Sequence, residues 1–162
     1  MALNAYLKID GIDGESRAEK HKDEIEIESF SWGESNFVSA GSGGGGGAGK
    51  VTMNDFHFVM SVSKASPKLF LACATGEHLP EAVLSIGKSG GDGRQIDYLY
   101  WKLSDCLVCS YQAGGSSGDP VPSDSFSLNF KKIEISYKQQ NADGSPGSEI
   151  RAGWDLAVSK KI

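Results

Sequence analysis

Alternating apolar and polar residues are the dominant pattern of this chain. At the start, Leu3, Ala5, Leu7 and Ile9 alternate with mostly polar side chains. A period of two places successive side chains on opposite faces of a strand, so this pattern predicts a strand with one buried face. The stretch from Gly11 to Gly14 then has the composition of a turn.

The alternation changes parity twice. Ile25 and Ile27 are followed by Phe30 and Trp32, which indicates a bulge near Ser29 or a strand buried on both faces. The same change recurs late in the chain, where the apolar residues are Phe126, Leu128, Phe130, Ile133, Ile135 and Tyr137. Bulges bend strands, and bent strands are what a closed barrel requires.

Further strands are predicted over residues 51–62, 82–88, 96–111 and 150–158. One helix is predicted between Ser66, a suitable N-cap followed by Pro67, and Gly76, a suitable C-cap. Its apolar stripe consists of Leu69, Phe70, Cys73 and Ala74. We therefore expect a mainly β fold, a small closed β-barrel of two packed antiparallel sheets, with one flanking α-helix at about residues 66–76.

The length of 162 residues indicates one domain over residues 1–162. A chain of this length buries about 70% of its unfolded surface, enough for a core without metal or disulfide staples. The net charge is −5 and no dense cluster of Lys and Arg occurs, which excludes nucleic acid as a partner. No apolar run is long enough for membrane insertion. The first ten residues have no basic leader or cleavage site, so we expect cytoplasmic synthesis and export without a signal peptide.

A glycine-rich stretch is the most tempting motif for chemistry. Residues 44–50 nearly match the phosphate-binding loop, but Val51 stands where that loop has a hydroxyl residue. The loop must also open a helix, and residues 51–59 have the pattern of a strand. We interpret residues 33–50 as a long glycine-rich loop between two strands, and loops of this length usually have a function.

Two other motifs do not support a catalytic site. Residues 114–118 fit the nucleophile elbow around Ser116, but two prolines follow where a helix is required. Cys106 and Cys109 have a redox or zinc spacing, yet side chains three apart in a strand point to opposite faces and no second pair exists. His21, His57 and His78 lie in separate settings. We expect no catalytic residue, no cofactor and no metal site.

Several stretches together resemble the haemolysin-coregulated protein (Hcp) family, the tube component of the bacterial type VI secretion system. The matching segments, in chain order, are residues 8–16, 30–33, the glycine-rich loop ending at Lys50 and Val51, 55–58, the helix 66–76 with His78, 128–130, 133–137 and 152–154. They run through nearly the whole chain.

The resemblance implies that six copies close into a ring and that rings stack into a hollow, exported tube. It implies as partners the chain itself, a VgrG-type spike protein, a contractile sheath and small effector proteins held in the lumen. It also implies that the long loop reaches the adjacent ring. The residues then expected to make stacking contacts are Gly33, Ser39, Gly43, Gly44, Gly45, Gly46, Gly47 and Lys50. The chain ends at Ile162, which argues against a toxin fused to its C-terminus.

Two other function classes stay open. An effector enzyme on the same scaffold would depend on Ser116, His57 or His78. A monomeric β-barrel would bind a small molecule in its interior. The bulky residues expected inside, which favour a filled barrel, are Phe30, Trp32, Phe126, Phe130 and Trp154.

Overall fold

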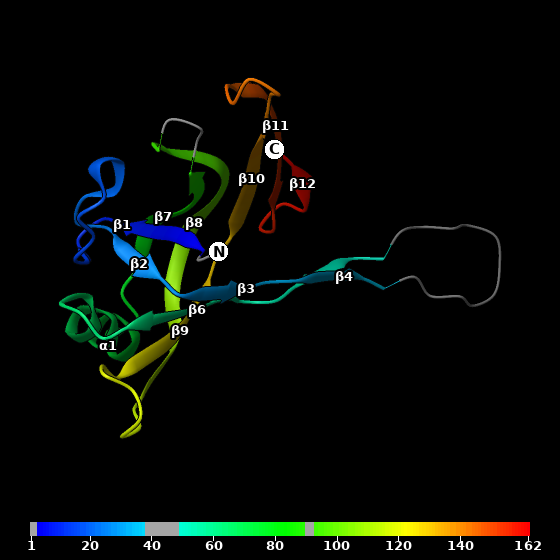
Figure 1. The fold of residues 1–162 in the computed structure, drawn as a ribbon. Helices are drawn as coiled ribbons and strands as arrows, with labels where there is room; N and C mark the ends of the chain where they lie inside the picture. Colours follow the sequence, from blue (N-terminus) through cyan, green and yellow to red (C-terminus); the bar gives the residue numbers. More distant parts are fainter. Residues whose placement is uncertain (1–2, 38–48, 90–92) are drawn as a thin grey trace.

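The computed structural model describes residues 3–37, 49–89 and 93–162. Figure 1 shows how its strands and α-helix are arranged. The strands are β1 (Asn4–Ile9), β2 (Ile25–Ile27), β3 (Ser29–Ser31), β4 (Glu34–Asn36), β5 (Val51–Met53), β6 (Phe56–Ser61), β7 (Leu79–Ser89), β8 (Gln95–Gly114), β9 (Ser123–Asn129), β10 (Lys132–Gln140), β11 (Pro146–Asp155) and β12 (Lys160–Lys161). A 3-10 turn, η1 (Glu19–His21), precedes β2, and α1 (Ala65–Thr75) follows β6.

Two antiparallel layers share the long strand β8. Its first half pairs with β7 and β10, and its second half pairs with β9. One layer therefore has the order β12-β11-β10-β8-β7-β1-β2, and the other consists of β8, β9, β6 and β3. The change of layer falls near Asp105, whose φ of 55° lies in the left-handed region that Asp tolerates better than most residues.

The first predicted change of parity is confirmed, one residue from the predicted position. β2 ends at Ile27 and β3 begins at Ser29, so the interruption is Glu28, whose backbone N–H donates to the Val59 carbonyl at 2.8 Å. β2 pairs with β1, whereas β3 pairs with β6. This strand thus passes from one layer to the other. Among the described residues no sheet closes on itself, so the predicted closed barrel is not confirmed, whereas the mainly β fold with one helix is.

One hydrophobic core fills the space between the layers. The predicted buried face of β1 is confirmed for Ala5, Leu7 and Ile9, and Leu3 is the exception because it is 45% exposed. Phe58 and Phe126 from the opposite layer stack with ring centroids 5.1 Å apart. Each fully buried large apolar side chain contributes roughly 1.5–3 kcal/mol relative to its exposed state.

The helix is at the predicted place, but two details of its prediction are wrong. Lys64, not Ser66, is the N-cap, and Ser66 instead donates a hydrogen bond from its Oγ to Asp124 Oδ2 at 2.5 Å. Phe70 is exposed, whereas Leu69 and Ala72 are buried. The buried face of the helix therefore differs from the predicted apolar stripe. The C-cap is confirmed, because Gly76 has a φ of 68° and donates to the Ala72 carbonyl.

Other differences concern strand boundaries. The late change of parity is not a bulge: β9 and β10 are separate strands, joined through Phe130 and Lys131, that pair in different layers. The predicted strand 51–62 is divided into β5 and β6. The predicted loop 33–50 contains β4, and the short β12 follows the last predicted strand.

Candidate assembly surface

An apolar sheet face extends beyond the covered core. Three rows of cross-strand neighbours run over β8, β10 and β11 on the same side as buried Leu84 of β7. The rows are Leu103–Ile133–Trp154, Trp101–Ile135–Ala152 and Leu99–Tyr137–Ile150. The first row reaches into the core, whereas Ile150 in the last row is 70% exposed. The pattern that buries β1 and β7 therefore continues over β10 and β11, which lie beyond the second layer formed by β3, β6, β9 and the end of β8 in the described part of the chain (Figure 1).

The opposite side of these strands is polar. Lys102 Nζ lies 4.0 Å from Glu81 Oε1 and 4.0 Å from Glu134 Oε2. Arg151 Nε lies 3.8 Å from Glu149 Oε1. Such exposed ion pairs contribute little to stability. The contrast between the two sides identifies the apolar side as the one suited to contact with protein.

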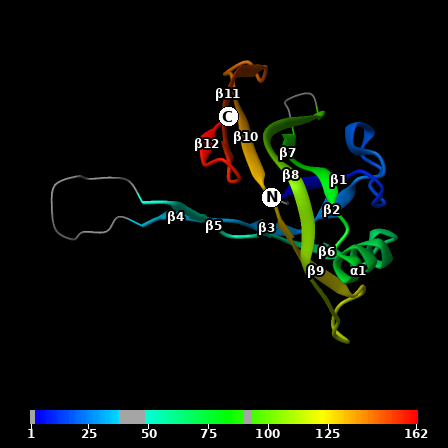
Figure 2. The same ribbon diagram turned by 180° about the vertical axis from the view of Figure 1, so that it is seen from behind.

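A hairpin made of β4 and β5 projects from the body next to this face (Figures 1 and 2). Its two strands pair only with each other in the described part of the chain. Between its base and the sheet lies a groove of about 1130 Å³. The groove is lined by Trp32 and Met53 on the hairpin side, and by Trp101, Ile135, Ala152 and Trp154 on the sheet.

All three tryptophans of the chain line this groove. Trp32 and Trp101 have ring centroids 5.4 Å apart, and the Trp32 Nε1 donates to the Asn54 carbonyl at 2.9 Å. The Nε1 atoms of Trp101 and Trp154 are buried and have no acceptor among the described residues. Buried hydrogen-bond donors without an acceptor are uncommon in native protein structures. We call this feature the tryptophan groove.

Two of the residues predicted for stacking, Gly33 and Lys50, are among the described residues. Gly33 lies at the hairpin base, where its carbonyl accepts from the Asn54 N–H at 3.0 Å, and Lys50 lines the groove. Ser39 and Gly43–Gly47 lie outside the described residues. Phe37 is 82% exposed, and a Cβ at Gly49 would lie 1.7 Å from the Phe37 carbonyl oxygen, so only glycine fits there.

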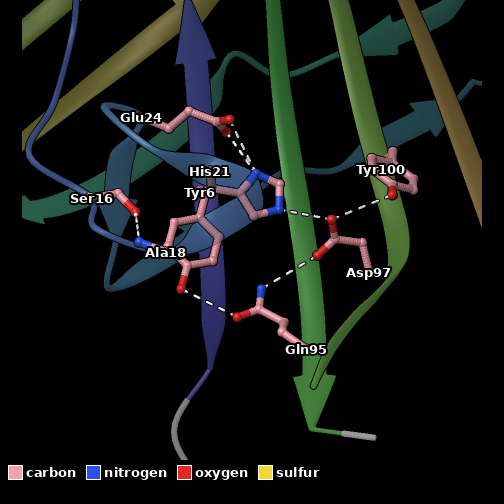
Figure 3. A network of polar contacts seen from close by, with 8 residues as sticks. All are labelled: Tyr6, Ser16, Ala18, His21, Glu24, Gln95, Asp97 and Tyr100. Carbon is pink, nitrogen blue, oxygen red and sulfur yellow. Dashed lines mark hydrogen bonds and ion pairs between the residues drawn. The ribbon is translucent and has the colours of Figure 1, made fainter.

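The most elaborate polar cluster surrounds the buried His21 (Figure 3). Its Nδ1 lies 3.0 Å from Glu24 Oε1, its Nε2 lies 2.7 Å from Asp97 Oδ2, and its ring stacks on Tyr6. Burial, followed by the nearby Glu26 and Asp97 charges, raises the pKa of Tyr6. Since carboxylates occupy both imidazole nitrogens, neither is available to act as a base on a substrate. The cluster is a structural clamp, and sequence reasoning missed it.

The remaining sequence candidates are dispersed. Ser116 is exposed and donates to Asp119 at 3.0 Å, while His57 contacts Ser127 and His78 contacts Asp105. Within the described ranges, no three or more His, Cys, Asp or Glu side chains are grouped so as to hold a metal ion. No helix in those ranges is both long and apolar enough to cross a membrane.

The cysteines diverge as predicted. Cys106 is buried and Cys109 is exposed. Burial raises the pKa of the Cys106 thiol to about 12, and partial burial together with Asp55 raises that of Cys109 to about 11. Both thiols are therefore protonated and weakly nucleophilic at neutral pH.

Fold and surface together define a β-rich structural protein that presents an uncovered apolar face. Residues 6–137 match the family model described as "Type VI secretion system effector, Hcp". The chain is 40% identical over 157 residues, 96% of each chain, to protein hcp1 of Pseudomonas aeruginosa. The chain belongs to the Hcp family.

Solved structures agree with this assignment. A type six secretion system protein has a TM-score of 0.91 at 32% identity, covering 99% of this chain and 100% of the other. Hcp1 of Salmonella typhimurium has a TM-score of 0.80 at 33% identity, with 100% of both chains covered. The chain is thus a secreted component of the type VI secretion tube, and it self-assembles into that tube. It is a structural protein and not an enzyme.

Proposed function

We propose that six copies of this chain close into a ring and that the rings stack into a hollow tube. The observation that carries the proposal is the hairpin of β4 and β5, which projects from the body and pairs only with itself among the described residues. An isolated two-stranded hairpin is marginally stable in water. Packing against another copy would stabilise it, and stacking supplies that contact.

Ring closure requires two different surfaces on each subunit, because a closed ring is a head-to-tail assembly. The apolar face of β8, β10 and β11 is one such surface. Gly33, Lys50 and the intervening loop, including Ser39 and Gly43–Gly47, make the stacking contacts.

The proposal includes the further partners that the resemblance to the family implies. The tube carries a VgrG-type spike protein at its tip, lies inside a contractile sheath, and holds small effector proteins in its lumen. Residues 1–162 form a single domain, which leaves the cell through this system.

The test is the native mass of the purified protein by light scattering, with negative-stain images of the same peak. We expect a mass of six subunits and ring-shaped particles. A monomer at every concentration measured would contradict the proposal. That result would favour the alternative of a monomeric ligand-binding barrel. The filled core argues against this alternative.

A further inference from the structure

We propose that the clamp around His21 is a pH-sensitive conformational device. The clamp holds the segment of residues 10–24 against β8 while both imidazole nitrogens carry a proton, and it releases the segment when one of these protons is lost. The 10–24 segment joins β1 to β2, and His21 lies near its end. The clamp lies within one protomer and does not depend on the proposed ring.

Hydrogen-bond geometry fixes how many protons the clamp holds. His21 Nδ1 lies 3.0 Å from Glu24 Oε1 and 3.1 Å from its Oε2, and His21 Nε2 lies 2.7 Å from Asp97 Oδ2. An ionised carboxylate only accepts hydrogen bonds, so each of the two nitrogens has to donate. Because imidazole is far more basic than a carboxylate, both protons belong to the ring. The closed clamp therefore contains an imidazolium ion between two carboxylates.

The groups that surround the ring suit a positive charge. Glu24 lies on one side of it and Asp97, at the start of β8, on the other (Figure 3). Tyr6 of β1 stacks on the ring with centroids 4.6 Å apart. Burial, and then the charge of Glu26 on β2, raises the pKa of Tyr6, so its hydroxyl stays neutral and adds no charge.

Loss of one proton would leave two hydrogen-bond acceptors facing each other. The side chains of His21 and Asp97 are buried, so water cannot replace the lost bond while the clamp is closed. The other partners of Asp97 are more distant, since Gln95 Nε2 and Tyr100 Oη lie 3.4 Å and 3.5 Å from its carboxylate. Movement of the segment away from β8 relieves this repulsion by admitting water.

The segment can open without unfolding the core. Ile12 is its one buried hydrophobic side chain, and the structure describes every residue of the segment. A backbone bond from the Gly14 N–H to the Asp23 carbonyl, at 2.8 Å, holds its two arms together. Segments with few buried apolar contacts open at a low cost in free energy. The effect of pH is therefore expected in this segment and not in the core strands.

Hydrogen–deuterium exchange of the purified protein, followed by mass spectrometry, tests the clamp across a pH series. Peptides that cover residues 10–24 are compared with peptides from β9, after correction for the intrinsic effect of pH on exchange. Nuclear magnetic resonance of isotope-labelled histidine follows the protonation of His21 in the same series. The His21 signal is assigned by its absence in His21→Gln.

Protection of residues 10–24 should fall by about tenfold or more as His21 loses a proton, because a hydrogen bond to a charged group is lost. Protection of β9 should not change over the same range. A neutral His21 in a segment that stays protected would overturn the proposal. A fall of equal size in β9 would also overturn it, because the opening would then be global.

Asp97→Asn separates the charge from the packing. The amide has nearly the same size, and it can accept from a protonated Nε2 or donate to a bare one. Protection of residues 10–24 should then no longer follow the protonation of His21. Glu24→Gln makes the same exchange at Nδ1 and carries the same expectation, so the test does not depend on one variant. An unchanged fall in both variants would rule out the facing carboxylates as its cause.

His78→Gln is the matched control. The His78–Asp105 pair is largely exposed, so this variant should show the same fall in protection as the unmodified protein. Disappearance of the fall in His78→Gln would mean that the pH effect does not arise at His21.

Discussion

His21 Nε2 lies 2.7 Å from Asp97 Oδ2, across 76 positions of sequence. This contact joins η1 to the first residues of β8, and Glu24 holds the other side of the ring (Figure 3). The side chains of His21 and Asp97 are each 8% exposed. The cluster therefore fastens the segment between β1 and β2 to the start of β8 in the same layer.

His21→Ala should destabilise the protomer by about 3 kcal/mol, because it removes the nearest partner of the buried Asp97 carboxylate, which keeps only the longer contacts to Gln95 and Tyr100. Urea denaturation should show a lower midpoint at an unchanged slope. His78→Ala is the control, since the His78–Asp105 pair is largely exposed and contributes less than about 1 kcal/mol. Equal losses in the two variants would contradict the clamp.

Ser66→Ala should destabilise the protomer by about 1–3 kcal/mol, because Asp124 is only 2% exposed and loses the hydrogen bond from the Ser66 hydroxyl. Thermal unfolding measures the loss. Ser116→Ala removes the same kind of bond, to Asp119, at an exposed position, and should leave the unfolding temperature nearly unchanged. A similar temperature shift in both variants would show that the burial of Asp124 does not matter.

The protomer should lose stability in alkali because of Cys106. Burial raises the pKa of its thiol from 9.0 to about 12, so the folded state holds the proton more tightly than the unfolded state. The resulting contribution is complete below pH 9 and is lost as the pH rises towards about 12. Cys106→Ala should flatten the decline in unfolding free energy across this range. An unchanged pH slope in that variant would mean that other groups cause it.

Deleting Gly43–Gly47 should leave rings of six subunits but weaken their stacking into tubes. The deletion shortens the stacking loop and leaves both the core and the tryptophan groove in place. Light scattering measures the ring, and negative-stain images measure tube length in the same preparation. Tubes of normal length would exclude the loop from stacking, whereas loss of the ring would show that the loop acts in ring closure.

Local periodicity predicted much of the fold. The alternation at Ala5, Leu7 and Ile9 depends on the geometry of one strand, and the structure confirms it. Gly76 ends α1 because the left-handed conformation suits a residue without a Cβ. The interruption near Ser29 was also visible, since a change of parity moves side chains to the other face. Ser66 was misjudged as an N-cap because its tertiary partner, Asp124, is 58 residues away.

The sequence by itself determined the β-rich class, the position of the helix, the absence of a matching catalytic motif and, through segments along nearly the whole chain, the resemblance to the Hcp family. These features depend on residues close in sequence or on a pattern of residue types. Only the tertiary structure decided that Trp32, Trp101 and Trp154 share one groove and that His21 meets Asp97. Such contacts depend on strand order and register, which bring distant segments together and leave no local periodicity by which to recognise them.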